Sequence, residues 1–194
     1  MPVLKTISKG LAFVCLNAFY SGRVGALPRI KEDGVIYRAC NRSDISNVMG
    51  LFKTLNNGGE ASLFQRLVYY IACRRFIYIA ERETSEGFEI SAFLICYFTK
   101  RDIVERTIHV NFIGARYGRK NTKAVLRLLR LANEHYCSSG LVGCSARITE
   151  TNKASLAIAA KSGYRSIERY CDPVSKKYRH YMLYMYEKSA GEAK

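Results

Sequence analysis

Apolar residues recur along this chain with two different periods, and these periods divide it into helices and strands. We expect helices where apolar residues recur every three or four positions, and strands where β-branched and aromatic residues gather or alternate with polar ones. The expected helices span about 4–18, 43–55, 61–73, 120–136 and 152–162. The expected strands span about 35–40, 76–80, 88–98, 106–113, 141–148, 164–170 and 178–186. This order predicts an α/β (α+β) fold, in which a mixed, twisted central sheet carries helices on both faces.

The first 34 residues precede this pattern and are expected to form an N-terminal amphipathic helix and a linker. The apolar stripe of the helix consists of Leu4, Ile7, Leu11, Val14, Cys15 and Ala18. Glycines, a proline and charged residues gather in 22–34, as is typical of a connector. The stripe favours a helix that packs on the domain, and a basic anchor on a membrane surface is the alternative. We therefore expect three parts: residues 1–34, a domain over 35–188 and a disordered tail over 189–194.

The charge of the chain is strongly unbalanced, because 31 Lys and Arg residues face 16 Asp and Glu residues, a formal net charge of +15. Such an excess predicts affinity for a polyanion: nucleic acid, an anionic membrane or a phosphorylated cofactor. The bases are densest between 114 and 130, where no acid occurs. These bases are Arg116, Arg119, Lys120, Lys123, Arg127 and Arg130. The alternative explanation is a helix face that is simply solvated.

Seven cysteines are scattered along the chain without any C-x-x-C pair. Because a zinc site needs clustered ligands, this spacing predicts no metal. Most of the cysteines lie inside apolar runs, which indicates reduced, buried thiols and a cytoplasmic protein. No apolar run approaches the ~20 residues needed to span a bilayer. The N-terminal helix leaves open a peripheral position at the inner membrane surface.

The order of elements in the second half of the chain resembles that of the GNAT superfamily of N-acetyltransferases. A strand, a basic turn, a long helix and a strand lead into a helix that Asn152 opens and that Lys161, Gly163 and Tyr164 close at the family's spacing. The resemblance covers about residues 35–187. It implies an acyltransferase with acetyl-CoA or another acyl-CoA as its donor and a primary amine as its acceptor.

In that family the basic turn holds the pyrophosphate of the cofactor, because a helix N-terminus offers unpaired N–H groups and a partial positive charge. The family's turn reads R-x-x-G-x-G/A, whereas this chain has Gly118, Asn121 and Lys123 at those three places. We expect side-chain cations to replace some backbone contacts; a turn that has lost the function is the alternative. The residues that the resemblance implies for acyl-CoA are Ile113, Gly118, Arg119, Lys120, Asn121, Thr122, Lys123 and Asn152.

The resemblance also implies a general base, because many members carry one on the strand before the turn, four positions before its end. If Ile113 ends this strand, the base is His109. Histidine is suited to take a proton from an amine and ordinarily titrates near pH 6.5. A histidine that only packs in the sheet is the alternative. Strict alternation along the strand would place His109, Asn111 and Ile113 on one face, and Val110 and Phe112 on the other.

One expected catalytic group is missing. Many members carry a tyrosine seven residues after the motif asparagine, where it protonates the leaving thiolate, and this chain has Ala159 there. Three functions therefore stay open. The first is acyl transfer, expected to be acetyl transfer, to a primary amine of a small molecule, an amino sugar or a protein. The others are a tRNA-directed acetyltransferase toxin and a degenerate fold that serves as a basic binding or scaffold module.

The partners expected from the sequence follow from these readings. A primary-amine acceptor is implied by the resemblance, and a tRNA or an anionic membrane surface would contact the basic face. The sequence leaves a homodimer open.

Overall fold

The computed structural model describes residues 2–85 and 87–186, so the expected tail at 189–194 lies outside the described residues. The described strands are β1 (Ile30–Glu32), β2 (Val35–Ala39), β3 (Ile77–Thr84), β4 (Gly87–Tyr97), β5 (Thr107–Ala115), β6 (Gly143–Thr149), β7 (Arg165–Cys171) and β8 (Tyr178–Met185). They form one sheet in the order β1-β2-β3-β4-β5-β6-β8-β7. Among them, β5 and β6 pair in parallel and all other neighbours are antiparallel.

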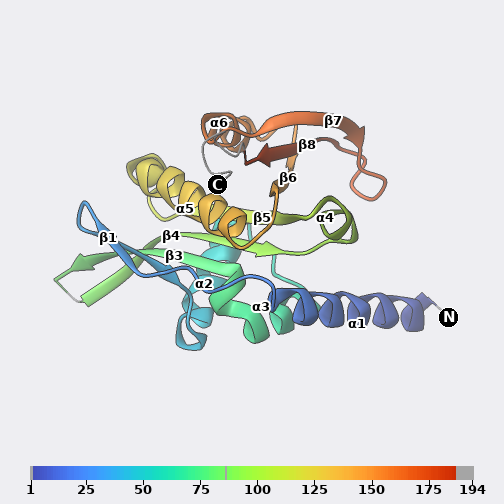
Figure 1. Ribbon diagram of the computed structural model, residues 1–194, viewed down its shortest axis with the longest axis horizontal. Coiled ribbons are helices and arrows are strands. Elements are labelled where there is room, and N and C mark those ends of the chain that lie inside the picture. The colour runs from blue at the N-terminus through green and yellow to red at the C-terminus, as the bar shows by residue number, and fades with distance from the viewer. Residues whose placement is uncertain (1, 86, 187–194) are drawn as a thin grey trace, which may run out of the picture.

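Helices cover both faces of this sheet. The helices are α1 (Pro2–Ser21), α2 (Ile45–Leu55), α3 (Leu63–Phe76), α4 (Lys100–Glu105), α5 (Thr122–Ser138) and α6 (Lys153–Lys161), and two 3₁₀ turns are η1 (Arg42–Asp44) and η2 (Gly118–Asn121). Figure 1 shows α1, α2 and α3 on one side of the central strands and α5 on the other. This arrangement confirms the mixed α/β fold that the hydrophobic pattern predicts.

The core lies on both sides of the central strands. All four residues from Ile77 to Ala80 at the start of β3 are buried, as is typical of a strand with helices on both faces. On α5, the apolar positions Val125, Leu128, Ala132 and Tyr136 are spaced three or four residues apart and are buried, as the helical period of this segment predicts.

Two short elements were not expected from the sequence. β1 pairs with β2 although it lies in the expected linker. α4 is only six residues long, which is too short for a helical period to be visible. Its start is set by a capping box in which Thr99 and Asp102 bond each other's backbone N–H groups. The domain boundary at residue 34 stays a prediction.

α1 is helical as expected, but the face that packs on the domain is not the expected one. Val14 is buried, whereas Leu4 and Leu11 of the same stripe are 75% and 52% exposed. The fully buried position is the polar Asn17. Its Nδ2 donates to the carbonyl of Phe98 at 3.1 Å, and the N–H of Phe98 donates to its Oδ1 at 2.7 Å. The spacing of apolar residues cannot predict a helix face that is held by a polar amide. The rest of the apolar stripe faces solvent.

The seven cysteines are all free thiols, and five of them are buried. Cys15 and Cys171 are exposed, so the expectation of mostly buried thiols is confirmed. Within the described ranges, every helix falls short of the length or the apolar content that crossing a bilayer requires.

Candidate functional site

The parallel strands β5 and β6 separate part of the way along their length. Their pairing runs from Thr107 opposite Gly143 to Val110 opposite Ala146, and then stops. β5 continues beside β4 as far as Ala115, and β6 continues beside β8 as far as Thr149. The sheet therefore divides into two parts with a wedge between them. Along this wedge, the β5 backbone beyond Val110 has a strand partner on one side only, so its polar groups can bind a ligand.

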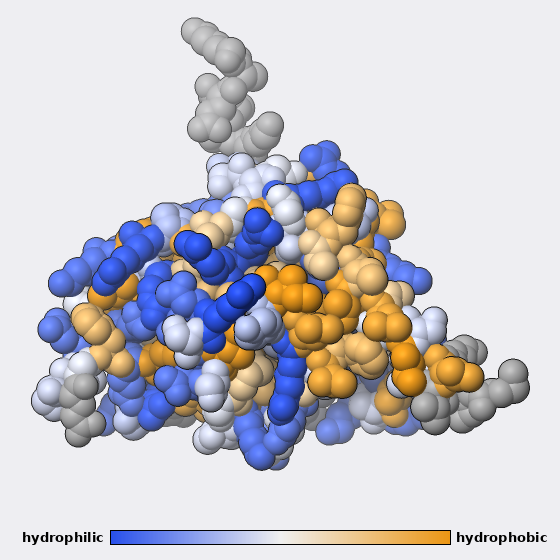
Figure 2. Space-filling model, turned by 90° about the horizontal axis from the view of Figure 1, so that it is seen from below, coloured by the Kyte–Doolittle hydropathy of each residue, from blue (hydrophilic) through white to orange (hydrophobic). Residues whose placement is uncertain are grey.

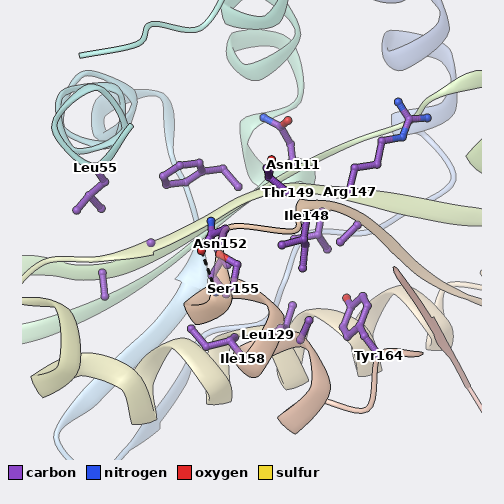
Figure 3. Close-up of a pocket in the computed structure, with 17 residues that line it drawn as sticks. Leu55, Asn111, Leu129, Arg147, Ile148, Thr149, Asn152, Ser155, Ile158 and Tyr164 are labelled. Atoms are coloured by element: carbon purple, nitrogen blue, oxygen red, sulfur yellow. Dashed lines mark hydrogen bonds between the residues drawn. The ribbon is translucent and has the colours of Figure 1, made fainter. Parts of the chain in front are cut away.

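A cavity of about 350 Å³ occupies this wedge. Its walls include Val110, Ala146 and Ile148 from the strands, Leu129 from α5, Ile158 from α6, and Asn152 just before α6. Figure 3 shows Asn111 and Arg147 on one side of the gap, and Leu129 and Ile158 on the other side near α5 and α6. The gap therefore has one largely apolar side and one side with polar and cationic side chains.

A β-bulge in β5 sets the direction of its side chains at the wedge. Val110 pairs with Cys96 and Phe112 pairs with Ile95, so Asn111 is one extra residue in β5. Asn111 lines the cavity, and its Nδ2 donates to the hydroxyl of Tyr69 on α3 at 3.2 Å. The expected strict alternation is therefore wrong at this point. The residues of β4 that pair with His109 and Phe112 are two positions apart, so these two side chains point to the same face of the sheet.

His109 is not part of the cavity wall. It is only 4% exposed, opposite Ser145 in the parallel register and against the ring of Tyr97. Its Nδ1 lies 2.9 Å from the Oγ of Ser145, and that hydroxyl donates to Oδ1 of Asp102 at 2.6 Å. Because the single hydroxyl proton of Ser145 is used on Asp102, Nδ1 of the neutral imidazole must carry its proton. The chain Asp102–Ser145–His109 thus leaves the lone pair on Nε2.

The surroundings of His109 shift its pKa away from the ordinary histidine value near 6.5. Burial lowers the pKa of the imidazole to about 4, and the nearby charge of Asp102 only partly offsets this effect. The imidazole is therefore neutral at physiological pH. It is a weaker base than an ordinary histidine, although its neutral form is always available.

Two of the expected cofactor residues lie at the cavity and six do not. Ile113 and Asn152 both line it. Asn152 also acts as the N-cap of α6, because its Oδ1 accepts a hydrogen bond from the N–H of Ser155 at 3.1 Å. The residues outside the lining are Gly118, Arg119, Lys120, Asn121, Thr122 and Lys123. They form η2 and the first turn of α5, just after the end of β5.

The basic turn at the end of β5 is held by the backbone and by one buried amide. Tyr117 and Gly118 have φ angles of 59° and 50°, so the chain reverses through two consecutive left-handed residues. Asn121 is buried, and its Nδ2 donates to the carbonyl of Arg116 at 2.7 Å. Lys120 and Lys123 are exposed, and the side chain of Arg119 is outside the described part of the structure. This geometry leaves cations at the N-terminus of the 17-residue helix α5.

The cavity wall, which consists entirely of described residues, carries only two titratable side chains, those of Arg147 and Tyr164. The Tyr164 hydroxyl donates to Oδ1 of Asn133 at 2.9 Å, and burial raises its pKa well above 10.0. Ala159 also lines the wall, at the place where the sequence lacks the expected tyrosine. Neither titratable wall residue can act as a general base near neutral pH.

Sequence reasoning missed Asn111 and Arg147, although both lie at the polar side of the cavity. No feature of the run from Thr107 to Ala115 marks the bulge that places Asn111. The expected basic face is also less charged than its sequence suggests. Arg116 pairs with Glu89 at 3.0 Å, and Arg127 pairs with Glu32 at 2.7 Å.

Comparison with known proteins identifies the fold. Neither protein-family models nor curated proteins give a match. Among solved structures, a chain of the NatC complex bound to Gag peptide and CoA aligns with a TM-score of 0.66 at 12% identity, over 79% of this chain and 99% of that one. The yncA protein of Salmonella typhimurium, solved with its cofactor acetyl-CoA, gives 0.62 at 14% identity, over 82% and 99%. An acetyltransferase of the GNAT family from Streptococcus pneumoniae gives 0.60 at 13%, over 79% and 99%.

These alignments confirm that the chain has the GNAT fold, as the resemblance of its sequence implied. They extend over almost the whole of each solved chain. At identities this low, the likeness concerns the fold alone, and the site must be argued from the residues of this chain.

The lowered pKa of His109 predicts how stability depends on pH. Between pH 7 and 5 the unfolded chain takes up a proton on this residue near pH 6.5, while the folded chain does not. The free energy of unfolding should therefore fall with the pH, and His109 should account for about 2 kcal/mol of this loss. Urea unfolding at pH 7 and pH 5 measures this loss of stability. The variant His109→Asn keeps a hydrogen-bond donor towards Ser145, and its free energy of unfolding should fall by about 2 kcal/mol less than that of the wild type. Equal losses in both proteins would show that His109 titrates normally in the folded state.

Proposed function

We propose that this protein is an N-acyltransferase that transfers an acyl group, expected to be acetyl, from acyl-CoA to a primary amine. The observation that carries the proposal is the wedge between β5 and β6, with its cavity and the free backbone edge of β5. Proteins that share the fold were solved with CoA or acetyl-CoA, which supports the donor. The acceptor is argued below from the side chains at the cavity.

The residues at the wedge fit an acyl-CoA. Its pantetheine arm is a thin chain with two amides, which suits the apolar wall of Val110, Leu129 and Ile158 beside unpaired peptide groups of β5. The volume of about 350 Å³ is near the lower end of the ~300–1,000 Å³ range of small-molecule pockets, so the phosphates would lie outside it. Lys120, Lys123 and the N-terminus of α5 would hold them there.

An acyl-CoA supplies the activated thioester, and the protein must then provide an amine that has lost its proton. No residue of the cavity wall can take that proton. We assign this role to His109, which lies in β5 where it still pairs with β6, just before the two strands separate. The bond from Nδ1 to Ser145 fixes the ring so that Nε2 keeps its lone pair. Because His109 is buried outside the cavity wall, the proton would have to reach Nε2 from the acceptor through a bridging water. Because Ala159 replaces the expected tyrosine, the thiolate would leave without a proton from that position, as its ordinary pKa near 8.5 allows.

A weak base favours an acceptor whose amine is already partly neutral. An α-amino group has a pKa of about 7.7–8.0, whereas a lysine side chain has one of about 10.4. At pH 7.5 the neutral fractions of the two therefore differ by roughly 10²-fold. We accordingly propose an α-amine as the acceptor, on a peptide or a small molecule. The tRNA-directed alternative gains less support, because Arg116 and Arg127 of the basic face are paired with acids.

A matched pair of acceptors tests this choice. One peptide carries a free N-terminus with its lysine acetylated, and the other carries an acetylated N-terminus with a free lysine. With acetyl-CoA at pH 7.5, kcat/KM should be roughly 10²-fold higher for the free N-terminus. Equal values would mean that the enzyme deprotonates the acceptor efficiently. No turnover of any amine, together with tight acetyl-CoA binding, would instead favour the scaffold function.

The role of His109 is tested by His109→Asn, which keeps a donor towards Ser145 but has no basic nitrogen at the Nε2 position. We expect kcat to fall about 10²-fold while the Kd of acetyl-CoA stays the same. His180→Asn is the matched control, since Nδ1 of His180 also lies 2.9 Å from a serine hydroxyl, that of Ser166. If His109→Asn kept full activity, the acceptor would be reacting without a base from this residue.

A further inference from the structure

Helices α1 and α3 pack side by side and run in the same direction. A Cβ on Gly10 of α1 would meet the ring of Phe64 at 2.2–2.4 Å, so only glycine allows this close approach. Farther along, Nη1 of Arg75 lies 3.5 Å from the hydroxyl of Ser21, and both contacts join residues 54 positions apart. The constant offset shows that the two helices are parallel. α1 begins well before the level at which α3 starts, and its first turns extend past α3 in Figure 1.

The outward sides of both helices are apolar. Large exposed side chains lie opposite the side that packs on the sheet, and we call them the α1–α3 apolar face: Leu4, Ile7 and Leu11 on α1, and Leu63, Leu67, Tyr70 and Ile71 on α3. Leu4 is 75% exposed and Leu63 is 76% exposed. Figure 2 looks onto the side of the molecule where these helices lie and shows hydrophobic residues gathered there. A contiguous apolar surface of this kind marks an interaction site in a soluble protein.

The charges on these two helices have a single sign. The sequence has no Asp or Glu before Glu32, and α3 has none at all. Exposed bases lie on the same two helices: Lys9 on α1, and Arg66 and Arg74 on α3. The acid beside them is Glu60, which pairs with Arg66 and Lys53. An apolar face on helices whose charged residues are all basic matches the chemistry of an anionic lipid surface, with acyl chains below acidic headgroups.

We propose that the α1–α3 apolar face docks this protein onto an anionic lipid bilayer, with both helices lying in the plane of the interface. A second copy fits this face less well, because a symmetric contact would place bases opposite bases. No helix in the described ranges is suited to span the bilayer, so the contact is one of surface insertion. The proposal concerns a surface distinct from the cavity, and it stands or fails independently of acyl transfer.

Vesicle flotation of the full chain tests the proposal. The probes are vesicles of phosphatidylcholine alone and vesicles with 30% phosphatidylserine. We expect micromolar binding to the anionic vesicles, at least tenfold weaker binding to the neutral ones, and weakening by salt. Leu4→Ser/Leu11→Ser should weaken binding to the anionic vesicles at least tenfold. Val104→Ser/Val174→Ser is the matched control. Val104 on α4 and Val174 in the loop between β7 and β8 are exposed apolar side chains away from this face, so their replacement should have no effect.

Three results of the flotation assay would overturn it. They are no binding of the wild type to anionic vesicles at low salt, equal binding to both kinds of vesicle, and equal loss of binding in the two double variants. Thermal melting of each variant serves as the check on folding, since all four side chains are exposed and the melting temperatures should match the wild type. Analytical sedimentation tests the alternative of a dimer. If the wild type formed a concentration-dependent dimer without binding vesicles, and Leu4→Ser/Leu11→Ser were monomeric, the face would join two copies instead.

Discussion

The separation of β5 from β6 is the constraint on which the rest of this structure depends. In a continuous sheet every interior peptide group is paired, and such a sheet offers a ligand nothing along its middle. Here the pairing stops after four residue pairs, and each strand keeps its other neighbour. The sheet therefore holds its two parts firmly while it leaves a free edge between them. The cavity lies in this separation, Asn152 lines it, and the basic turn follows the end of the β5 segment that borders it.

The bulge at Asn111 and the buried chain of Asp102, Ser145 and His109 add the chemistry. The bulge shifts side chains in β5 by one position, which brings an amide to the cavity beside the tyrosine of α3. The buried carboxylate of Asp102 accepts hydrogen bonds from the hydroxyls of Thr107 and Ser145, and the Ser145 hydroxyl is also hydrogen-bonded to His109. Burial holds the imidazole neutral near physiological pH. In the proposed function His109 would therefore act as a weak base whose neutral form is always present, rather than as a switch near neutral pH.

Much of the fold could be predicted from the sequence, because long helices and buried strands have clear periods. The α5 face of Val125, Leu128, Ala132 and Tyr136 is an example, and so is the helix that Asn152 caps. The features that were missed depend on contacts distant in sequence. The side-chain amide of Asn17 forms two hydrogen bonds with the backbone of Phe98, 81 residues away. Because this side of α1 faces the domain, most of the expected apolar stripe faces solvent. The bulge in β5 arises from its register with β4, and the sequence around Asn111 carries no sign of it.

The central claim, that the free edge of β5 holds the donor, is tested most directly by hydrogen exchange of individual backbone amides with and without acetyl-CoA. The account predicts that those amides within residues 111–115 that point away from β4, into the wedge, exchange readily in the free protein and become protected when acetyl-CoA is added. Amides of β2 and β3, far from the wedge, should change much less. If acetyl-CoA binds and raises the melting temperature while residues 111–115 exchange at the same rate, the donor lies elsewhere and the account is wrong.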